Sequence, residues 1–238
     1  MILFFIRHGD PIYDPDSLTP LGHRQAEAIG RRLARYGLDE IYVSSSTRAI
    51  ETSIPTREML KMDATILDWT NESHAWRQMS LMTEDGRRVW GFTRPDIREL
   101  FTSKEIRALG EKWYTHPYLQ DTTLPEGYLR IKNHTREFLA SQGYVWDEEK
   151  GQYRNEVQND KRIALFAHHG FGVTFLSSVL DIPYPQTSLK FNFSHSGMTV
   201  IDFSSEDGYA IPQILTLAND GHLLADGLPT KYNNYLYF

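Results

Sequence analysis

The chain of 238 residues contains no cysteine. Disulfide bonds, thiolate metal ligands and a cysteine nucleophile are therefore all excluded. Long apolar runs are also missing, because no stretch reaches the roughly 18 residues that a transmembrane helix needs. The apolar run at residues 1–6 is too short for the core of a signal peptide. We therefore expect a cytoplasmic protein.

The sequence also has no block of like charge. Its formal net charge is −6 and its isoelectric point is about 5.8. Because nucleic-acid surfaces and membrane patches need clustered lysine and arginine, we expect neither nucleic acid nor a membrane as a partner. Hydrophobic residues make up 40% of the chain, and no internal repeat or low-complexity segment divides it. A single domain over residues 1–238, with a sizeable core, is predicted.

The first candidate site residues follow the first apolar run. Residues 1–6 read as a short buried strand, and Arg7, His8 and Gly9 come directly after it. In open α/β sheets, ligands bind outside the carboxyl ends of the strands. Arg7 and His8 are therefore predicted to face a crevice rather than the core.

Two later strands are also followed by polar residues at the same edge. The strand predicted at residues 40–44 leads into a hydroxyl-rich turn, and Arg48 falls in the first turn of the next helix, where backbone N–H groups favour anions. The strand predicted at residues 162–167 ends in His168, His169 and Gly170. Three strand ends thus supply arginine, histidine and hydroxyl groups to one place.

The remaining elements follow from periodicity and caps. Thr19 and Pro20 are predicted to begin a helix that stops at Gly37, and Pro55 is predicted to end or kink the helix that starts near Arg48. Residues 75–124 show no clear strand. They contain a helix that is capped by Ser103 and runs to about Trp113, and the whole segment is predicted to be an insertion over the sheet. Further strands are expected near residues 65–68, 198–203 and 212–217, helices over residues 128–139 and 173–180, and a small hairpin at about 143–156.

Taken together, these motifs resemble the histidine phosphatase superfamily, also called phosphoglycerate-mutase-like. They are Arg7-His8-Gly9, Leu18-Thr-x-Leu-Gly22-x-x-Gln25-Ala26, Ser44-Ser45 with Arg48-Ala49 and Thr52, Asn71-Glu72, and a later strand that ends in His-Gly. The motifs occur in the family's order and span most of the chain. The resemblance implies an α/β fold, a three-layer α/β/α sandwich around a mostly parallel sheet, with the largely helical insertion over the active site.

The resemblance also implies a covalent mechanism. His8 would attack phosphorus through one ring nitrogen and form a phosphohistidine, and its other ring nitrogen would bond to a partner such as a backbone carbonyl. Arg7, Arg48 and one histidine of the later pair would bind the non-bridging oxygens. No metal ion and no other cofactor is implied.

Two carboxylates compete for the role of general acid. By resemblance, Glu72 would protonate the leaving oxygen and then deprotonate the attacking water. Asp10, beside the nucleophile, is the rival. Here the sequence departs from the family, in which Gly9 is commonly followed by Glu-Ser or Glu-Thr, whereas this chain has Asp10-Pro11.

His168 and His169 compete for the role of phosphate ligand, because adjacent side chains on a strand point to opposite faces. The position of His169 directly before Gly170 favours His169. The length of the strand favours His168, which then ends the strand where the family's histidine usually lies. We predict His168 as the ligand, with His169 and Asp10 at the pocket rim.

The remaining histidines and the arginines of the insertion are weaker candidates. His195 and His222 could reach the pocket or simply bond within their loops. We expect the others to lie on the surface or on helices and the arginines to form a solvated face: His23, His74, His116 and His134, and Arg87, Arg88, Arg94 and Arg98.

The resulting prediction is a phosphatase that hydrolyses a small phosphorylated substrate. A phosphoglycerate mutase would share the chemistry, but it usually carries a Trp-Asn stretch after the nucleophile loop, where this chain has residues 13–17, Tyr-Asp-Pro-Asp-Ser. A transferase or phosphatase that acts on a phosphoprotein is a second alternative. A binding module with an inactive site is a third, although such relatives tend to lose the nucleophile or an arginine. The oligomeric state stays open.

Overall fold

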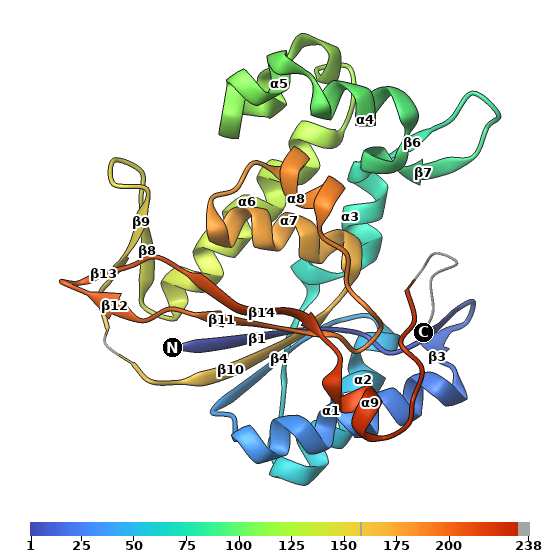
Figure 1. The fold of residues 1–238 in the computed structure, drawn as a ribbon, viewed down its shortest axis with the longest axis vertical. Helices are drawn as coiled ribbons and strands as arrows, with labels where there is room; N and C mark the ends of the chain where they lie inside the picture. Colours follow the sequence, from blue (N-terminus) through green and yellow to red (C-terminus); the bar gives the residue numbers. More distant parts are fainter. Residues whose placement is uncertain (158, 233–238) are drawn as a thin grey trace.

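Six strands form the central sheet of the computed structural model, which describes residues 1–157 and 159–232 (Figure 1). Their order is β14-β11-β1-β10-β4-β5. Strands β1, β10, β4 and β5 run parallel to one another, whereas β11 runs antiparallel to both of its neighbours, β1 and β14. The mostly parallel sheet is therefore as predicted. The strands are β1 Ile2–Arg7, β4 Glu40–Ser44, β5 Thr65–Leu67, β10 Arg162–Ala167, β11 Met198–Asp202 and β14 Gln213–Asn219.

The register of the sheet brings the predicted strand ends together. Arg7, the last residue of β1, lies opposite Ala167, the last residue of β10. Phe166 of β10 in turn lies opposite Val43 of β4. His8, His168 and the turn after β4 therefore leave the sheet side by side at its carboxyl edge.

Alternate side chains of the buried strands pack on opposite layers. Phe4 and Ile6 pack with Phe166 on the face covered by α1 (Pro20–Tyr36) and α2 (Thr47–Leu60). Leu3 and Phe5 belong to the larger cluster on the other face, which includes residues of α6 (Leu124–Ser141) and α7 (His169–Leu180). The three-layer α/β/α sandwich is confirmed, because each face of the sheet buries its own apolar set.

Of the predictions for the two helices α1 and α2, one is correct and one is wrong. Helix α1 begins as expected, with the Thr19 hydroxyl accepting from the Gly22 N–H at 3.0 Å, and it ends at Gly37. Helix α2 does not end early at Pro55 but continues to Leu60. Gly30 of α1 lies so close that a Cβ there would be 3.0 Å from the Pro55 Cβ. Packing between α1 and α2 thus outweighs the hydrogen bond that proline cannot make.

The segment at residues 75–124 contains more structure than expected. It includes a hairpin, β6 (Ser80–Met82) with β7 (Arg88–Trp90), although no strand was predicted there. The Ser103 side chain caps α5 as expected, accepting from the Ile106 N–H at 3.2 Å, but the helix ends at Leu109 rather than near Trp113. Gly110 ends it with a φ of 56°. Most of the segment is helical: α3 Glu72–Met79, α4 Pro95–Thr102, α5 Lys104–Leu109, and the 3₁₀ turns η2 Gly91–Thr93, η3 Gly110–Thr115 and η4 Pro117–Leu119.

Helices α4 and α5 lie outside α7 and α8 (Tyr184–Lys190), on the side away from the sheet (Figure 1). They are held there by aromatic contacts, since Phe101 and Tyr184 both lie against the Trp113 ring, with centroids 5.4 and 5.3 Å away. This part of the insertion therefore thickens the second helical layer. From this segment, the described residues that reach the pocket at the carboxyl edge of the sheet are Trp76 of α3 and Trp90 at the end of β7.

The small hairpin is present as β8 (Tyr144–Asp147) and β9 (Gln152–Asn155), and β13 and β12 extend it to four strands. In the described part of the chain, no helix combines the length and the apolar character needed to cross a membrane. The remaining elements are β2 Pro11–Tyr13, β3 Asp16–Leu18, the 3₁₀ turn η1 Asp68–Thr70, β12 Ser205–Glu206, β13 Tyr209–Ala210 and α9 Gly221–Ala225.

Candidate active site

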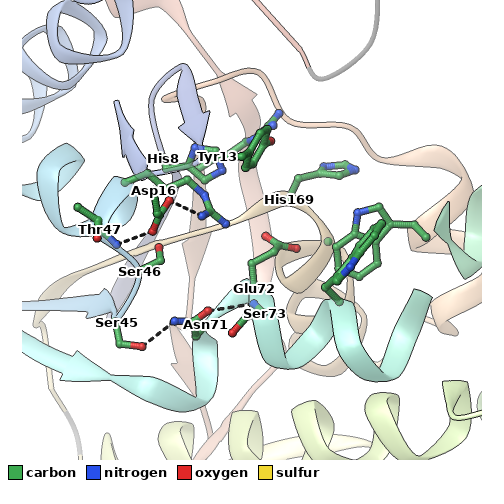
Figure 2. Close-up of a pocket in the computed structure, with 15 residues that line it drawn as sticks. His8, Tyr13, Asp16, Ser45, Ser46, Thr47, Asn71, Glu72, Ser73 and His169 are labelled. Atoms are coloured by element: carbon green, nitrogen blue, oxygen red, sulfur yellow. Dashed lines mark hydrogen bonds and ion pairs between the residues drawn. The ribbon is translucent and has the colours of Figure 1, made fainter. Parts of the chain in front are cut away.

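A pocket of about 790 Å³ opens at the carboxyl edge of the sheet (Figure 2). It lies where the ends of β1 and β4, the start of α3 and the turn after β10 meet. Five of the predicted site residues line it directly: Arg7, His8, Arg48, Glu72 and His169. The residues that form its wall are Arg7, His8, Tyr13, Asp16, Ser45, Ser46, Thr47, Arg48, Asn71, Glu72, Ser73, Trp76, Trp90, His169 and Gly170.

His8 is held in one orientation at the end of β1. Its backbone N–H donates to the Ala167 carbonyl at 2.9 Å, and its Nδ1 lies 2.7 Å from the Gly9 carbonyl oxygen. A carbonyl oxygen only accepts, so Nδ1 carries the proton and Nε2 keeps its lone pair. Burial and the nearby Arg7 guanidinium lower the pKa of His8 well below its usual range. The ring is therefore neutral at neutral pH.

The loop after His8 packs against the first turn of α1 with no room for side chains. A Cβ on Gly9 would lie 2.7 Å from the Gly22 carbonyl oxygen, and a Cβ on Gly22 would lie 2.3 Å from the Asp10 carbonyl oxygen. The Thr52 hydroxyl accepts the Gly9 N–H at 2.9 Å, and the Gln25 side chain accepts the Asp10 N–H at 2.7 Å. The residues of the early motifs therefore fix the backbone of the nucleophile loop.

Two arginines place positive charge beside His8. Arg7 is fully buried and donates through Nη1 to the Phe193 carbonyl, and burial lowers the pKa of Arg7 to about 10. The Arg48 side chain is also largely buried, and its Nη1 donates to Asp16 Oδ1 at 2.6 Å. Its guanidinium lies over the Tyr13 ring, 5.4 Å from the centroid. Both arginines stay charged at neutral pH.

Glu72 projects into the pocket from the first position of α3 (Figure 2). The Asn71 side chain begins this helix by accepting the Ser73 N–H at 2.9 Å. Glu72 Oε1 accepts the Phe171 N–H at 3.1 Å, which links α3 to α7. One backbone bond thus orients the carboxylate, and its second oxygen, Oε2, lies 3.5 Å from His168 Nδ1.

His168 lies directly behind the pocket wall and is fully buried. Its Nε2 is 2.8 Å from Ser44 Oγ and 3.2 Å from Ser46 Oγ. Its Nδ1 lies 3.5 Å from Glu72 Oε2, and a carboxylate oxygen beside Nδ1 favours the tautomer with the ring proton on Nδ1 and with Nε2 as the acceptor. The ring centroid is 5.2 Å from that of His8. Burial and the charge of Arg48 lower the pKa of His168 well below its usual range, so the ring is neutral.

His169 occupies a different place from its neighbour. It lines the pocket, as expected for a rim residue, and its ring lies edge-on to Phe92 and Phe193 at 6.2 and 5.4 Å. Burial lowers the pKa of His169 to about 3. His168, and not His169, therefore adjoins both His8 and Glu72.

Asp10 does not lie at the pocket rim, contrary to the prediction. It is not among the described residues that line the pocket, because its carboxylate turns toward the C-terminal part of the chain. Its Oδ1 lies 3.2 Å from both His195 Nδ1 and Lys231 Nζ, and its Oδ2 accepts from the Thr19 hydroxyl at 2.7 Å. Burial alone would raise the pKa of Asp10, but the bonds from His195 and Thr19 outweigh it and lower that pKa. Asp10 stays ionised and has no proton to donate.

His195 contacts the ring of His8, and His222 is linked to the His8 backbone through Ser196. The His195 ring stacks on the His8 ring at 5.8 Å with 29° between the planes. His222 Nε2 is 2.9 Å from Ser196 Oγ, and the Ser196 N–H donates to the His8 carbonyl at 3.0 Å. Burial lowers the pKa of His222 to about 4. Both histidines support the nucleophile loop and neither lines the pocket.

The other predicted surface residues lie away from the pocket. His74, His116 and His134 each lie near an acidic side chain, and His23 is exposed on α1. Of the insertion arginines, Arg87 pairs with Asp85 and Arg94 with Asp96, Arg88 bonds to Ser80, and Arg98 lies on α4. None of them is among the described lining residues.

Comparison with known families now decides the identity of the fold. The family model described as histidine phosphatase superfamily (branch 1) matches residues 3–213. The chain belongs to the histidine phosphatase superfamily. No curated protein sequence matches it.

Solved structures similar to this superfamily member carry phosphatase names. A phosphoserine phosphatase mutant from Entamoeba histolytica with bound phosphoserine has a TM-score of 0.57 at 16% identity, covering 93% of this chain and 98% of that one. A mycobacterial glucosyl-3-phosphoglycerate phosphatase with inorganic phosphate has a TM-score of 0.58 at 16% identity, covering 93% and 98%. An alpha-ribazole phosphatase from Shigella flexneri has a TM-score of 0.58 at 16% identity, covering 92% and 97%. At this identity the likeness shows the fold alone.

Several residues of the superfamily site were missed by sequence reasoning. Tyr13 and Asp16 belong to the β2–β3 hairpin, whose three-residue strands give no periodic signal. Trp76 and Trp90 come from the insertion, where nothing in the sequence marks a pocket wall. Among residues 1–157 and 159–232, no group of three or more histidine, aspartate or glutamate side chains is arranged to hold a metal ion.

Proposed function

We propose that this histidine phosphatase superfamily member hydrolyses phosphomonoesters through a phosphohistidine on His8. One observation carries the proposal: the 2.7 Å bond from Nδ1 to the Gly9 carbonyl leaves Nε2 as a neutral nucleophile between two buried arginines. A neutral imidazole attacks phosphorus, whereas a protonated one cannot.

In the first step, the lone pair of His8 Nε2 forms the bond to phosphorus while the bond from phosphorus to the ester oxygen breaks. Arg7, Arg48 and the Nδ1–H of His168 donate to the non-bridging oxygens, where the charge of the transition state lies. Glu72, in its protonated form, gives its proton to the departing oxygen. The alcohol leaves neutral, and Glu72 is left as a carboxylate.

In the second step, water attacks the phosphohistidine. The Glu72 carboxylate takes a proton from the water as its oxygen bonds to phosphorus, and the bond from phosphorus to Nε2 breaks. The electron pair of that bond returns to His8 as the free lone pair. Inorganic phosphate leaves, and both side chains regain their starting states.

The size of the pocket supports a small phosphorylated molecule as substrate. Its volume of about 790 Å³ falls in the range of sites that enclose small molecules. No residue beyond those already named is needed to bind the phosphoryl group.

The test is release of phosphate from p-nitrophenyl phosphate in the presence of EDTA. We expect turnover in the wild type, its loss in His8→Ala, and its retention in His23→Ala, a matched control at an exposed histidine of α1. A trapped intermediate should be labile in acid and stable in alkali, as a phosphoramidate is. Full activity in His8→Ala, or loss of wild-type activity with EDTA, would overturn the proposal.

A further inference from the structure

Aromatic rings form much of the pocket wall beyond the phosphate-binding residues. Tyr13, Trp76 and Trp90 all line it. The rings of Trp76 and Trp90 meet edge to face, with centroids 5.1 Å apart and 82° between the planes. Phe92 stacks on the other side of Trp90 at 5.9 Å and 17°. The two tryptophans are thus braced by neighbours and form a fixed aromatic surface.

Trp90 lies immediately beside the carboxylate of Glu72. A Cβ on Gly170 would be 2.3 Å from Trp90 Cζ2 and 2.5 Å from Glu72 Oε1, so the ring and the carboxylate both press on this one glycine. Glu72 is the group that protonates the leaving oxygen in the proposed reaction. The carbon skeleton attached to that oxygen must therefore lie next to Trp90.

The charges of the wall restrict what that skeleton carries. Arg7 and Arg48 are the only lysine or arginine residues among the described residues that line the pocket, and both are assigned to the phosphoryl group. His169 is neutral, since burial lowers its pKa to about 3. No lining cation is left for a second anionic group.

Asp16 adds a fixed negative charge to the same wall. Its Oδ2 accepts the Thr47 N–H at 2.8 Å, at the start of α2, and its Oδ1 accepts from Arg48 at 2.6 Å (Figure 2). The side chain is 30% exposed, so its charge acts on the pocket. A carboxylate on the substrate would meet the charge of Asp16, and no lysine or arginine is left among the described lining residues to bind it.

We propose that the leaving group is a flat aromatic or heteroaromatic alcohol without a carboxylate, which packs against Trp90 and is selected against acids by Asp16. This inference rests on the proposed phosphatase activity and names its substrate class. Aromatic contact beside the leaving oxygen holds the ester in line with His8. Like charge at Asp16 makes phosphorylated carboxylic acids poor substrates.

The test uses three esters whose leaving alcohols have similar acidity: benzyl phosphate, cyclohexylmethyl phosphate and 4-carboxybenzyl phosphate. For the wild type, we expect kcat/KM for benzyl phosphate to exceed that for cyclohexylmethyl phosphate by roughly 3- to 10-fold, the range of one aromatic contact. We expect it to exceed that for 4-carboxybenzyl phosphate by about tenfold or more, because of like charge.

Two variants separate the two parts of the proposal. Trp90→Leu keeps an apolar, although smaller, side chain and removes the aromatic face, so the preference for benzyl over cyclohexylmethyl phosphate should vanish. Asp16→Asn keeps one acceptor oxygen, enough for either Arg48 or Thr47, and removes the charge, so discrimination against 4-carboxybenzyl phosphate should fall at least about threefold. Tyr118→Ala is the control, since Tyr118 is an exposed aromatic of the same insertion outside the pocket wall.

The ratios within each variant are the readout, so a general loss of activity does not mimic the result. Equal kcat/KM for the three esters in an enzyme that hydrolyses p-nitrophenyl phosphate would overturn this inference and leave the phosphatase standing. Unchanged ratios in Trp90→Leu and Asp16→Asn would do the same. An inactive wild type on all four esters would overturn the proposed function itself, and this inference with it.

Discussion

The carboxylate of Glu72 and the imidazole of His168 approach each other to 3.5 Å, from Oε2 to Nδ1, although 96 positions separate them in the chain. Each is oriented by an independent bond on its far side. The Phe171 N–H holds Glu72, and the Ser44 hydroxyl holds His168. In the proposed reaction the two groups frame the place where the ester oxygen leaves, Glu72 as proton donor and His168 as hydrogen-bond donor to the phosphoryl group.

Substitution of Glu72 by glutamine should separate substrates by leaving group. A poor leaving group needs the proton, so turnover of benzyl phosphate should fall about 100-fold or more, the scale of general acid catalysis. Turnover of p-nitrophenyl phosphate should fall much less, because its phenolate leaves without help. Equal losses on both substrates would argue against Glu72. If Asp10→Asn shows the leaving-group dependence instead, the proton donor is Asp10.

The two adjacent histidines should differ in their contribution to turnover. His168→Ala removes a hydrogen bond to the charged transition state and should lower kcat by about 100-fold. His169→Ala removes a neutral rim residue, and kcat should stay within a few-fold of the wild type. Steady-state kinetics on p-nitrophenyl phosphate measures both. The reverse order would mean that the phosphate ligand is His169.

Stability should decrease as the pH falls through 6.5. Burial lowers the pKa of His8, His168, His169 and His222, so the unfolded chain binds more protons than the folded one below their usual value of about 6.5. Each such group can cost about 1.4 kcal/mol per pH unit there. Asp181 has the opposite effect. Burial raises its pKa to about 7, so the folded chain takes up one proton there as the pH falls, which partly offsets the loss of stability.

The check is to measure the thermal unfolding midpoint by circular dichroism at several pH values between 7.5 and 5.5. His222→Gln removes one of the titrating rings outside the pocket wall, so the free energy of unfolding should depend less steeply on pH. A midpoint that stays constant or rises on acidification would contradict the burial of neutral histidines.

An alanine at Gly22 should disturb the nucleophile loop through packing alone. Its Cβ would lie 2.3 Å from the Asp10 carbonyl oxygen and 3.1 Å from the Leu18 Cβ, so the loop must shift. We expect a loss of about 1–3 kcal/mol in the free energy of unfolding, as for overpacking, together with lower kcat. Gly221→Ala is the matched control, because a Cβ there meets only Asn219 Oδ1 at 3.3 Å. Equal stability of the two variants would show that the loop has room to move.

The features that could be predicted from the residues alone depend on neighbours close in the sequence. Thr19 caps helix α1 and Gly37 ends it, and both residues can be recognised in the sequence. The apolar runs of β1 and β10 likewise show where each strand ends and which residues follow it. Those signals lie within a few residues of the feature they predict. The placement of Arg7, His8 and Arg48 could therefore be predicted from local signals, whereas the three-layer fold was predicted from the resemblance to the superfamily.

The unpredictable part depends on distant contacts. Asp10 turns away from the pocket because Lys231, 221 positions later, lies 3.2 Å from its carboxylate. Pro55 stays inside a helix because Gly30 leaves space for it. Trp90 reaches the pocket wall through a hairpin that no sequence pattern marked. In each case the deciding neighbour belongs to another element, and a single sequence does not reveal which one.

The order of the strands in the sheet determines how late in synthesis the loop around His8 can form. β1 emerges first from the ribosome, yet its two neighbours, β10 and β11, begin only at Arg162 and Met198. Until those residues are made, the His8 loop lacks the Ala167 carbonyl and the Ser196 N–H that hold its backbone. His8 is therefore synthesised long before the elements that hold its backbone, so the loop around it is assembled among the last parts of the domain.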